Sequence, residues 1–106
     1  MMSKTRKAAA SNVLEDLGFE DAEELTAKAI LALKANEIFA ARGLTQIEAA
    51  KLVGMPQSKI SQIRNYRLQN ISLERLMHVL VALDQHVEIV VTPARGRQVS
   101  AIAVAA

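Results

Sequence analysis

The stretch that decides the fold is "TQIEAAKLVGMPQSKISQIRN", which covers residues 45–65. Thr45 followed three residues later by Glu48 is the capping-box pattern that begins a helix, and Gly54 supplies the stop. Pro56 suits the first position of the next helix, because its missing N–H costs nothing there. Two short helices joined by a glycine turn predict a helix-turn-helix.

The second helix of this unit is expected to end near Asn65 or Tyr66, with Ile60 and Ile63 pointing inward. Its outer face carries amides, hydroxyls and positive charge, and it contains no acid. The major groove of DNA admits one α-helix, and its base edges pair with amide and guanidinium groups. An acid-free face also avoids repulsion by the phosphates. The pattern favours a DNA-recognition helix over a merely solvated surface helix.

Helices are also predicted on both sides of this unit. Upstream, Asp21 and Glu24 form a second capping-box pair, and Gly43 follows the helix that they begin. Its expected buried face comprises Leu25, Ala29, Ile30, Leu33, Asn36, Ile38 and Phe39. Downstream, Ser72 caps a helix whose expected buried face comprises Leu73, Leu76, Met77, Leu80 and Leu83. Within the central unit, Ala50 is small where the helices approach, and Leu52, Val53 and Met55 are expected to be buried.

The stretch "HVEIVVTP", residues 86–93, changes to a period of two and predicts a strand. Val87, Ile89 and Val91 would share one face of that strand. A single strand leaves its backbone groups unpaired, so it needs a partner. The favoured partner is the same strand of a second copy, which would give an antiparallel homodimer. The alternative partner is the chain's own tail, residues 98–104.

The two ends are expected to be less regular. Residues 1–11 are predicted to be a disordered arm, whose Lys4, Arg6 and Lys7 either reach DNA or are simply solvated. A short helical turn is expected over residues 12–18. The tail, residues 94–106, is expected to be either frayed or a weak second strand.

Composition agrees with a helical domain that binds an anion. Only 3% of the 106 residues are aromatic, and much of the 51% that are hydrophobic is alanine, as closely packed helices require. Six acids and no base fall in residues 15–24, whereas ten bases and five acids follow from residue 25 onward. This asymmetry indicates an anionic partner for the basic body, although a solvated charge mixture would give it too.

Several classes of protein have no support in the sequence. The chain has no cysteine and fits a reducing cytoplasm, and no apolar run approaches a membrane span. Its two histidines, His78 and His86, have no partner at metal-ligand spacing, so neither a metal nor a cofactor is expected. No nucleophile elbow or phosphate-binding glycine loop is present, and we do not expect an enzyme.

The stretch quoted first resembles the helix-turn-helix of the XRE family, the Cro/C1-type repressors. The flanking "NVLEDLGFEDAEELTAKAILA" and "ISLERLMHVLVALDQHVEIVV" extend the resemblance to small XRE-type regulators that include HigA-like antitoxins. The resemblance covers roughly residues 12–93. It implies an all-α, lambda repressor-like DNA-binding domain with a short C-terminal β-strand and the helix-turn-helix at 45–66.

Carried over by position, the resemblance implies base contacts from Gln57, Ser58, Lys59 and Gln62. It implies contacts with the DNA backbone from Gln46, Ser61, Arg64, Asn65 and Arg67. One position departs from the family, since Tyr66 stands where glycine usually follows the recognition helix. Either Asn65 takes the left-handed conformation instead, or Tyr66 packs or touches DNA.

These expectations lead to a sequence-specific transcriptional regulator, a repressor that binds an inverted-repeat operator as a homodimer in the cytoplasm. The alternative is an antitoxin that neutralises a RelE/HigB-like toxin by direct binding and regulates its own operon. The acidic residues 15–24 would then offer a face to a basic toxin. Double-stranded DNA is the expected partner in both cases.

Overall fold

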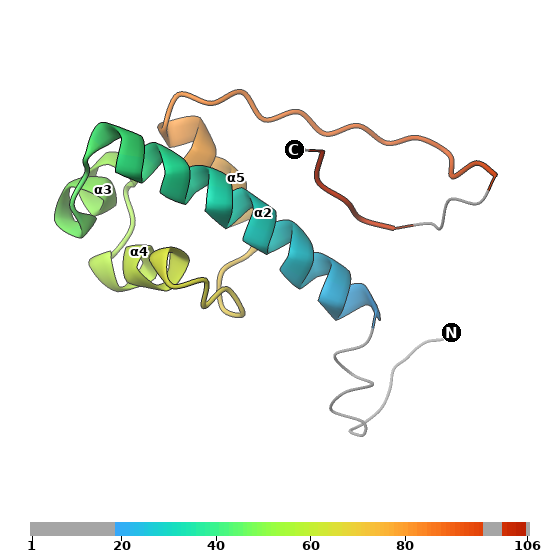
Figure 1. Ribbon diagram of the computed structural model, residues 1–106, viewed down its shortest axis with the longest axis horizontal. Helices are drawn as coiled ribbons and strands as arrows, with labels where there is room; N and C mark the ends of the chain where they lie inside the picture. The colour runs from blue at the N-terminus through green and yellow to red at the C-terminus, as the bar shows by residue number, and fades with distance from the viewer. Residues whose placement is uncertain (1–18, 97–100, 106) are drawn as a thin grey trace, which may run out of the picture.

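The computed structural model describes residues 19–96 and 101–105, with only the backbone of residues 19–21. The described ranges contain four helices, α2 (Phe19–Arg42), α3 (Gln46–Val53), α4 (Gln57–Arg64) and α5 (Leu73–Ala82). The long α2 crosses the molecule, α3 and α4 gather at its C-terminal end, and α5 lies along it (Figure 1). The predicted all-α fold is confirmed in these ranges. The predicted arm and the turn at 12–18 lie outside them.

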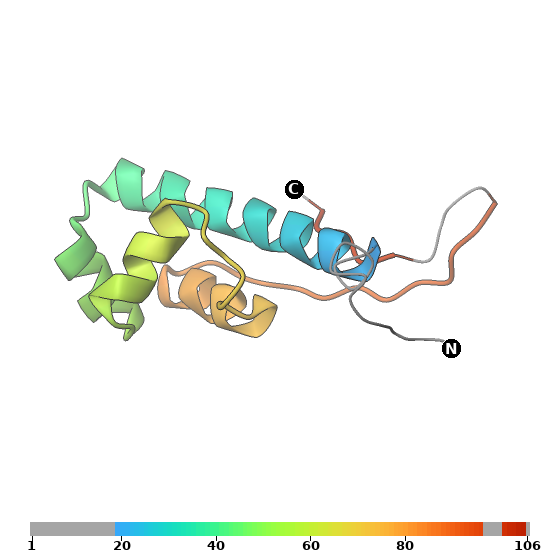
Figure 2. The same ribbon diagram turned by 90° about the horizontal axis from the view of Figure 1, so that it is seen from below.

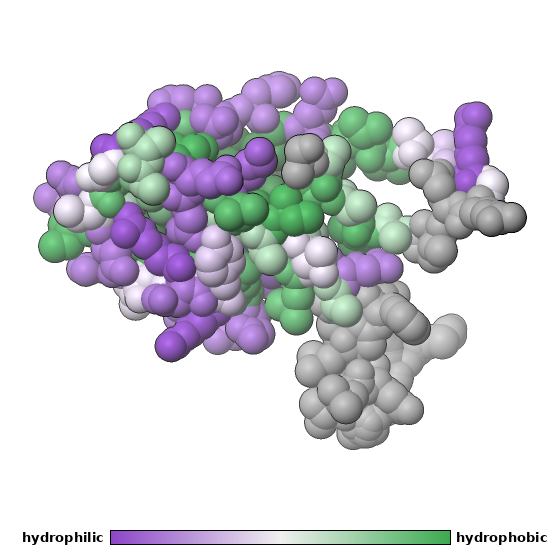
Figure 3. Space-filling view, viewed as in Figure 1, coloured by the Kyte–Doolittle hydropathy of each residue, from purple (hydrophilic) through white to green (hydrophobic). Residues whose placement is uncertain are grey.

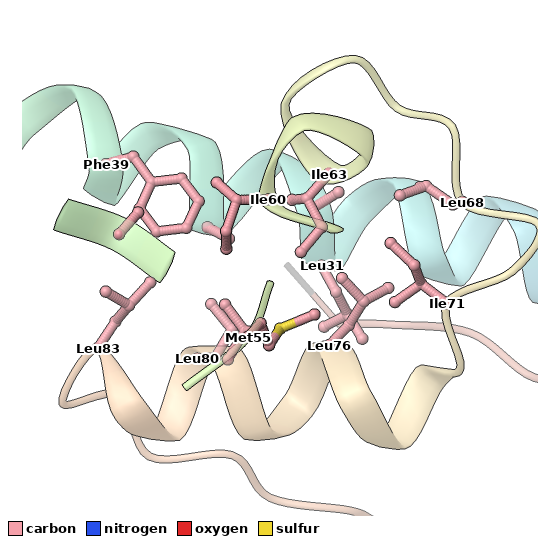
Figure 4. Packing of buried hydrophobic residues seen from close by; sticks show 14 residues of the cluster. Leu31, Phe39, Met55, Ile60, Ile63, Leu68, Ile71, Leu76, Leu80 and Leu83 are labelled. Carbon is pink, nitrogen blue, oxygen red and sulfur yellow. The ribbon is translucent and has the colours of Figure 1, made fainter. Parts of the chain in front are cut away.

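One apolar core is shared by all four helices. Side chains from α2, α4 and α5 converge in it, among them Phe39, Ile60 and Leu76 (Figure 4). Fully buried alanines at Ala32 and Ala35 leave room for the neighbouring helices to approach α2 closely. The core therefore combines alanines of α2, beside Leu31 and Phe39, with aliphatic residues of the shorter helices.

The buried face of α2 is not the one predicted. Leu33 is 47% exposed, whereas Ala27, Leu31 and Ala32 are buried. Phe39 alone belongs to both the predicted and the observed set of buried residues. The prediction was wrong because it followed the large apolar residues, and the close helix contacts are made by alanines that give a weak hydropathy signal.

The start of α2 also differs from the prediction. The helix begins at Phe19, so Asp21 lies inside the first turn rather than at the cap. Acids are favoured by the helix dipole throughout the first turn, so the local pattern does not fix the first residue. The C-terminal end of α2 agrees with the prediction. The helix stops at Arg42, and Gly43 follows it in the left-handed conformation, with a φ of 64°.

The start of α5 agrees with the prediction, because the Ser72 side chain accepts a hydrogen bond from the Arg75 N–H at 3.0 Å. Leu76, Leu80 and Leu83 are buried as expected. Arg42 of α2 donates to the Leu83 carbonyl at 2.8 Å and so ties the ends of α2 and α5 together.

The predicted strand is not seen. Residues 84–96 are irregular in the structure and extend beyond the N-terminal end of α2 (Figures 1 and 2). Ile89 and Val90 are each 72% exposed, and Val91 is 89% exposed. Strand assignment requires a ladder of backbone hydrogen bonds to a neighbouring strand, and no strand is assigned in the described ranges. The alternating sequence therefore gives an extended chain without a ladder.

The described part of the tail packs against α2. Ile102 N–H donates to a carboxylate oxygen of Glu23 at 3.3 Å, and Val104 is partly buried against the core. These residues line a shallow groove with Ala22, Thr26 and neighbouring residues of α2. Residues 101–105 are neither strand nor helix, so they do not form the weak second strand considered above.

Candidate nucleic-acid interface

The first helix of the interface, α3, begins at a complete capping box. The Thr45 hydroxyl accepts from the Glu48 N–H at 3.1 Å, and the Glu48 carboxylate accepts from the Thr45 N–H at 2.9 Å. At the other end, Gly54 has a φ of 72° and its N–H donates to the Ala50 carbonyl at 2.9 Å. Glycine meets this left-handed conformation without strain. Both predicted boundaries of α3 are confirmed.

Thr45→Ala is expected to lower the free energy of unfolding by about 1 kcal/mol, because the Glu48 N–H loses its acceptor. Urea unfolding followed by circular dichroism measures the change. Thr45→Ser keeps the hydroxyl and is the matched control, expected to change stability far less. Equal losses in the two variants would contradict a capping role for the hydroxyl.

The second helix of the unit, α4, follows the turn with Pro56 as its N-cap, one position before the predicted place. Ile60 and Ile63 are 0% exposed and anchor the helix to α2 and α5 (Figure 4). Met55, in the turn, is also buried, whereas Leu52 of α3 is 45% exposed against expectation. The two isoleucines fix which face of α4 points outward.

The outer face of α4 is polar. Gln57, Ser58 and Asn65 are exposed, whereas Lys59, Ser61 and Gln62 are partly buried. Hydrophilic side chains cover most of the end of the molecule that α3 and α4 form (Figure 3). No acid occurs between Glu48 and Glu74 in the sequence. The segment that contains α4 therefore offers hydrogen-bonding groups and cations and carries no acid of its own.

Three of the predicted contact residues of α4 also take part in hydrogen bonds within the protein. The Asn65 amide donates to the Ser61 carbonyl at 2.9 Å and approaches the Ser61 hydroxyl at 3.5 Å. The Lys59 ammonium reaches the Asn70 carbonyl at 3.5 Å. These bonds limit the freedom of the side chains, of which Asn65 is exposed and Lys59 and Ser61 are partly buried.

Gln62 is less accessible than its place in the sequence suggests. Its side-chain oxygen is buried and has no hydrogen-bond partner in the structure. Gln57, in the first turn of α4, is exposed instead. Of the two glutamines, Gln57 is thus the one whose amide is open to a ligand in this conformation.

Arg64 is turned back toward the body of the protein. Its guanidinium donates to the Leu44 carbonyl and lies 5.4 Å from the centre of the Phe39 ring. Its Nε is buried and has no partner. The family resemblance implied a DNA-backbone contact for Arg64, and the sequence contained no signal for these long-range contacts. Part of the guanidinium is engaged in linking α4 to α2.

The chain after α4 contains the departure from the family pattern. Tyr66 itself has a φ of 58°, while Asn65 has a φ of −101°, so the alternative in which Asn65 is left-handed is wrong. Tyr66 is 46% exposed and Arg67 is exposed beside it. Gln46, at the start of α3, is partly buried. Gln46 therefore lies before α4 in the chain, and Tyr66 and Arg67 lie shortly after it.

Sequence reasoning missed one residue near this interface. Lys28 of α2 is 5% exposed, and its ammonium donates to the Leu68 carbonyl at 3.2 Å in the loop after α4. Its spacing from Leu31 and Ala35 places it on the buried face of α2, but that face was assigned to other residues. The correct helical phase would have identified it.

Other kinds of site find no support in the described ranges. They contain no group of three or more acids and histidines that could hold a metal ion. His78 and His86 are both exposed, and the His86 ring lies 3.5 Å from the Glu88 carboxylate. No described helix is long and apolar enough to cross a membrane.

A capped helix, a left-handed glycine turn and a second helix with an acid-free outer face together define a helix-turn-helix DNA-binding domain. A family model described as "Helix-turn-helix domain" matches residues 13–92. The chain is also similar to a solved structure whose name places it in the XRE family of transcriptional regulators. The two share 45% sequence identity and superpose with a TM-score of 0.75, over 81% of this chain and 98% of that chain. No curated protein matches.

The chain therefore belongs to the helix-turn-helix domain family, as an XRE-type DNA-binding transcriptional regulator.

Proposed function

We propose that the protein is a sequence-specific repressor that binds an inverted-repeat operator as a homodimer. The observation that supports this most is the orientation of α4, whose Ile60 and Ile63 are fully buried while its opposite face is polar and acid-free. A helix held in this way can enter one major groove, and a dimer can place two copies about 34 Å apart.

Within this proposal, the candidate contact residues divide into two groups by their positions in the family's motif. Gln57, Ser58, Lys59 and Gln62 contact base edges, because amides, hydroxyls and ammonium groups match the donors and acceptors there. Gln46, Ser61, Arg64, Asn65 and Arg67 contact the sugar-phosphate backbone. Gln62 and Arg64 need to turn outward on binding, since parts of both side chains are buried in the free protein.

The homodimer would form through residues 87–91. Three consecutive apolar side chains are exposed there, which a monomeric protein in water does not favour. Val87, Ile89 and Val91 would share one face if the segment pairs with its copy across a two-fold axis. The pairing would give the segment a ladder of backbone hydrogen bonds, which it does not form with the described part of its own chain.

Selection of bound sequences from a random pool of DNA duplexes tests the proposal directly. A palindromic consensus with half-sites one helical turn apart is the expected result. Enrichment of no sequence, or of a single non-repeated site, would contradict the sequence-specific dimer. Repression is then tested by placing the consensus over a reporter promoter, where the protein should lower expression.

Gln57→Ala is expected to weaken binding to the selected operator by about 1–3 kcal/mol and to leave binding to random DNA nearly unchanged. The reason is that an amide paired with a base contributes only at the correct base. Fluorescence anisotropy with both duplexes measures the difference, and Gln62→Ala tests the second glutamine in the same way. Gln85→Ala, beyond α5, is the matched control; equal weakening on both duplexes would exclude base reading by Gln57.

The antitoxin role is our second candidate, and it has less support. Of the acids in residues 15–24, the structure describes the side chains of Glu23 and Glu24. Glu23 accepts from the Ile102 N–H, and Glu24 lies 3.3 Å from the Lys28 ammonium. Both carboxylates are thus engaged within the chain and less available to a basic toxin. Co-purification of a small basic protein encoded beside this gene would favour the antitoxin role.

A further inference from the structure

Lys28 occupies a position where a lysine is unusual. It lies on the buried face of α2, between the buried Ala27 and Leu31, and is itself only 5% exposed. A buried ammonium is costly unless it is paired, and an apolar residue of similar size is usually as stable there or more stable. Packing in the core therefore does not by itself explain a lysine at this position.

The two partners of Lys28 show what it connects. Its ammonium lies 3.3 Å from the carboxylate of Glu24, one helical turn earlier, and donates to the Leu68 carbonyl at 3.2 Å. The Glu24 side chain is 45% exposed, so the pair stays partly hydrated on that side. Leu68 is 40 residues away in the sequence and belongs to the loop between α4 and α5.

This loop, residues 66–71, has no helix or strand but is fixed at several points. The Arg67 N–H donates to the Gln62 carbonyl at 2.8 Å, and the Ile71 N–H donates to the Leu68 carbonyl at 3.1 Å. The buried side chains of Leu68 and Ile71 hold the loop against the core. Its remaining side chains, Tyr66, Arg67, Gln69 and Asn70, are exposed.

We propose that Lys28 is a positioning residue for DNA binding: its bond to the Leu68 carbonyl orders loop 66–71 as a second DNA-backbone contact surface beside α4. This inference rests on the proposed DNA binding. The loop is suited to phosphates because it contains a cation, amides and a phenol but no acid. Ordering it in the free protein avoids an entropy loss that binding would otherwise incur.

Lys28→Met tests the proposal, because methionine keeps much of the side-chain volume and removes the donor and the charge. The expected result is about a ten-fold loss of affinity, similar for operator and random DNA, since backbone contacts carry no sequence information. Hydrogen exchange should become faster at the amides of Arg67 and Ile71 while the amides of α2 and α5 keep their protection. Lys28→Arg retains a donor and should recover most of the affinity.

A double-mutant cycle with Arg67→Ala separates positioning from general destabilisation. Arg67→Ala alone should reduce affinity about five-fold and lower the salt dependence by about one unit. In the Lys28→Met protein, the same substitution should cost less than about two-fold, because the arginine is no longer held in place. A purely structural role for Lys28 would leave the two losses multiplicative, and that result would overturn the proposal.

The remaining outcomes are also decisive. Lys28→Gln, whose amide is one bond too short to reach Leu68, replaces Lys28→Met if the latter does not fold at low temperature. If the wild-type and Lys28→Met proteins bind DNA equally well, the proposed role of Lys28 is refuted and the proposed function is not. Wild-type protein that selects no sequence and binds no duplex would refute the proposed function itself.

Discussion

Phe39→Ala is expected to lower the free energy of unfolding by about 3–5 kcal/mol. Phe39 is 1% exposed and lies in the core where α2, α4 and α5 meet (Figure 4). Its ring also lies under the Arg64 guanidinium. The substitution leaves a cavity and removes the surface on which Arg64 rests. Because small domains are stable by only about 5–15 kcal/mol, a large fraction of the stability would be lost.

Urea unfolding monitored by circular dichroism measures this loss. Phe39→Leu is the matched control, because it largely preserves the buried volume but removes the ring. The repacking should lower the free energy of unfolding by less than about 1.5 kcal/mol. Loss of the cation–π contact should add a small further decrease. If alanine and leucine destabilise the protein equally, the ring–guanidinium contact rather than the buried volume dominates. A loss below about 1 kcal/mol for alanine would contradict the central place of Phe39 in the core.

Ile89→Asp is expected to reduce affinity for the inverted-repeat operator by about 100-fold or more, because binding through two linked half-sites becomes binding through one. A carboxylate at the proposed two-fold axis would face its own copy, and like charges directly opposite each other are destabilising. Affinity for a single half-site should change little. Sedimentation velocity should show the variant as a monomer at concentrations where the wild-type protein is a dimer.

Val90→Asp is a close control for this experiment. Val90 has the same 72% exposure as Ile89 but would point to the opposite face of a paired segment. It should remain dimeric and bind the operator nearly as wild type does. Loss of the dimer in both variants would indicate an apolar contact without strand pairing, and a dimer retained in both would place the interface elsewhere.

The sequence by itself determined the helix-turn-helix, because every signal that defines it is local. The Thr45–Glu48 capping box, the left-handed Gly54 and the spacing of Ile60 and Ile63 each depend on residues within about one or two turns. Signals this local depend little on the rest of the fold, although the similar Asp21–Glu24 pair did not mark the start of α2. The ends of α3 and the inward face of α4 are therefore predictable from the sequence alone.

Only the tertiary structure decided the features that depend on contacts between residues distant in the sequence. The phase of α2 depends on close approach at alanines, whose hydropathy is too weak to mark a face. The bonds of Lys28 to Leu68, and of Arg64 to Leu44 and Phe39, join residues 20 or more positions apart. Likewise, an alternating sequence at residues 87–91 becomes a strand only if a neighbour supplies hydrogen bonds, and one chain supplies none in the described ranges. Pairing is a property of two segments, so the pattern of one segment cannot determine it.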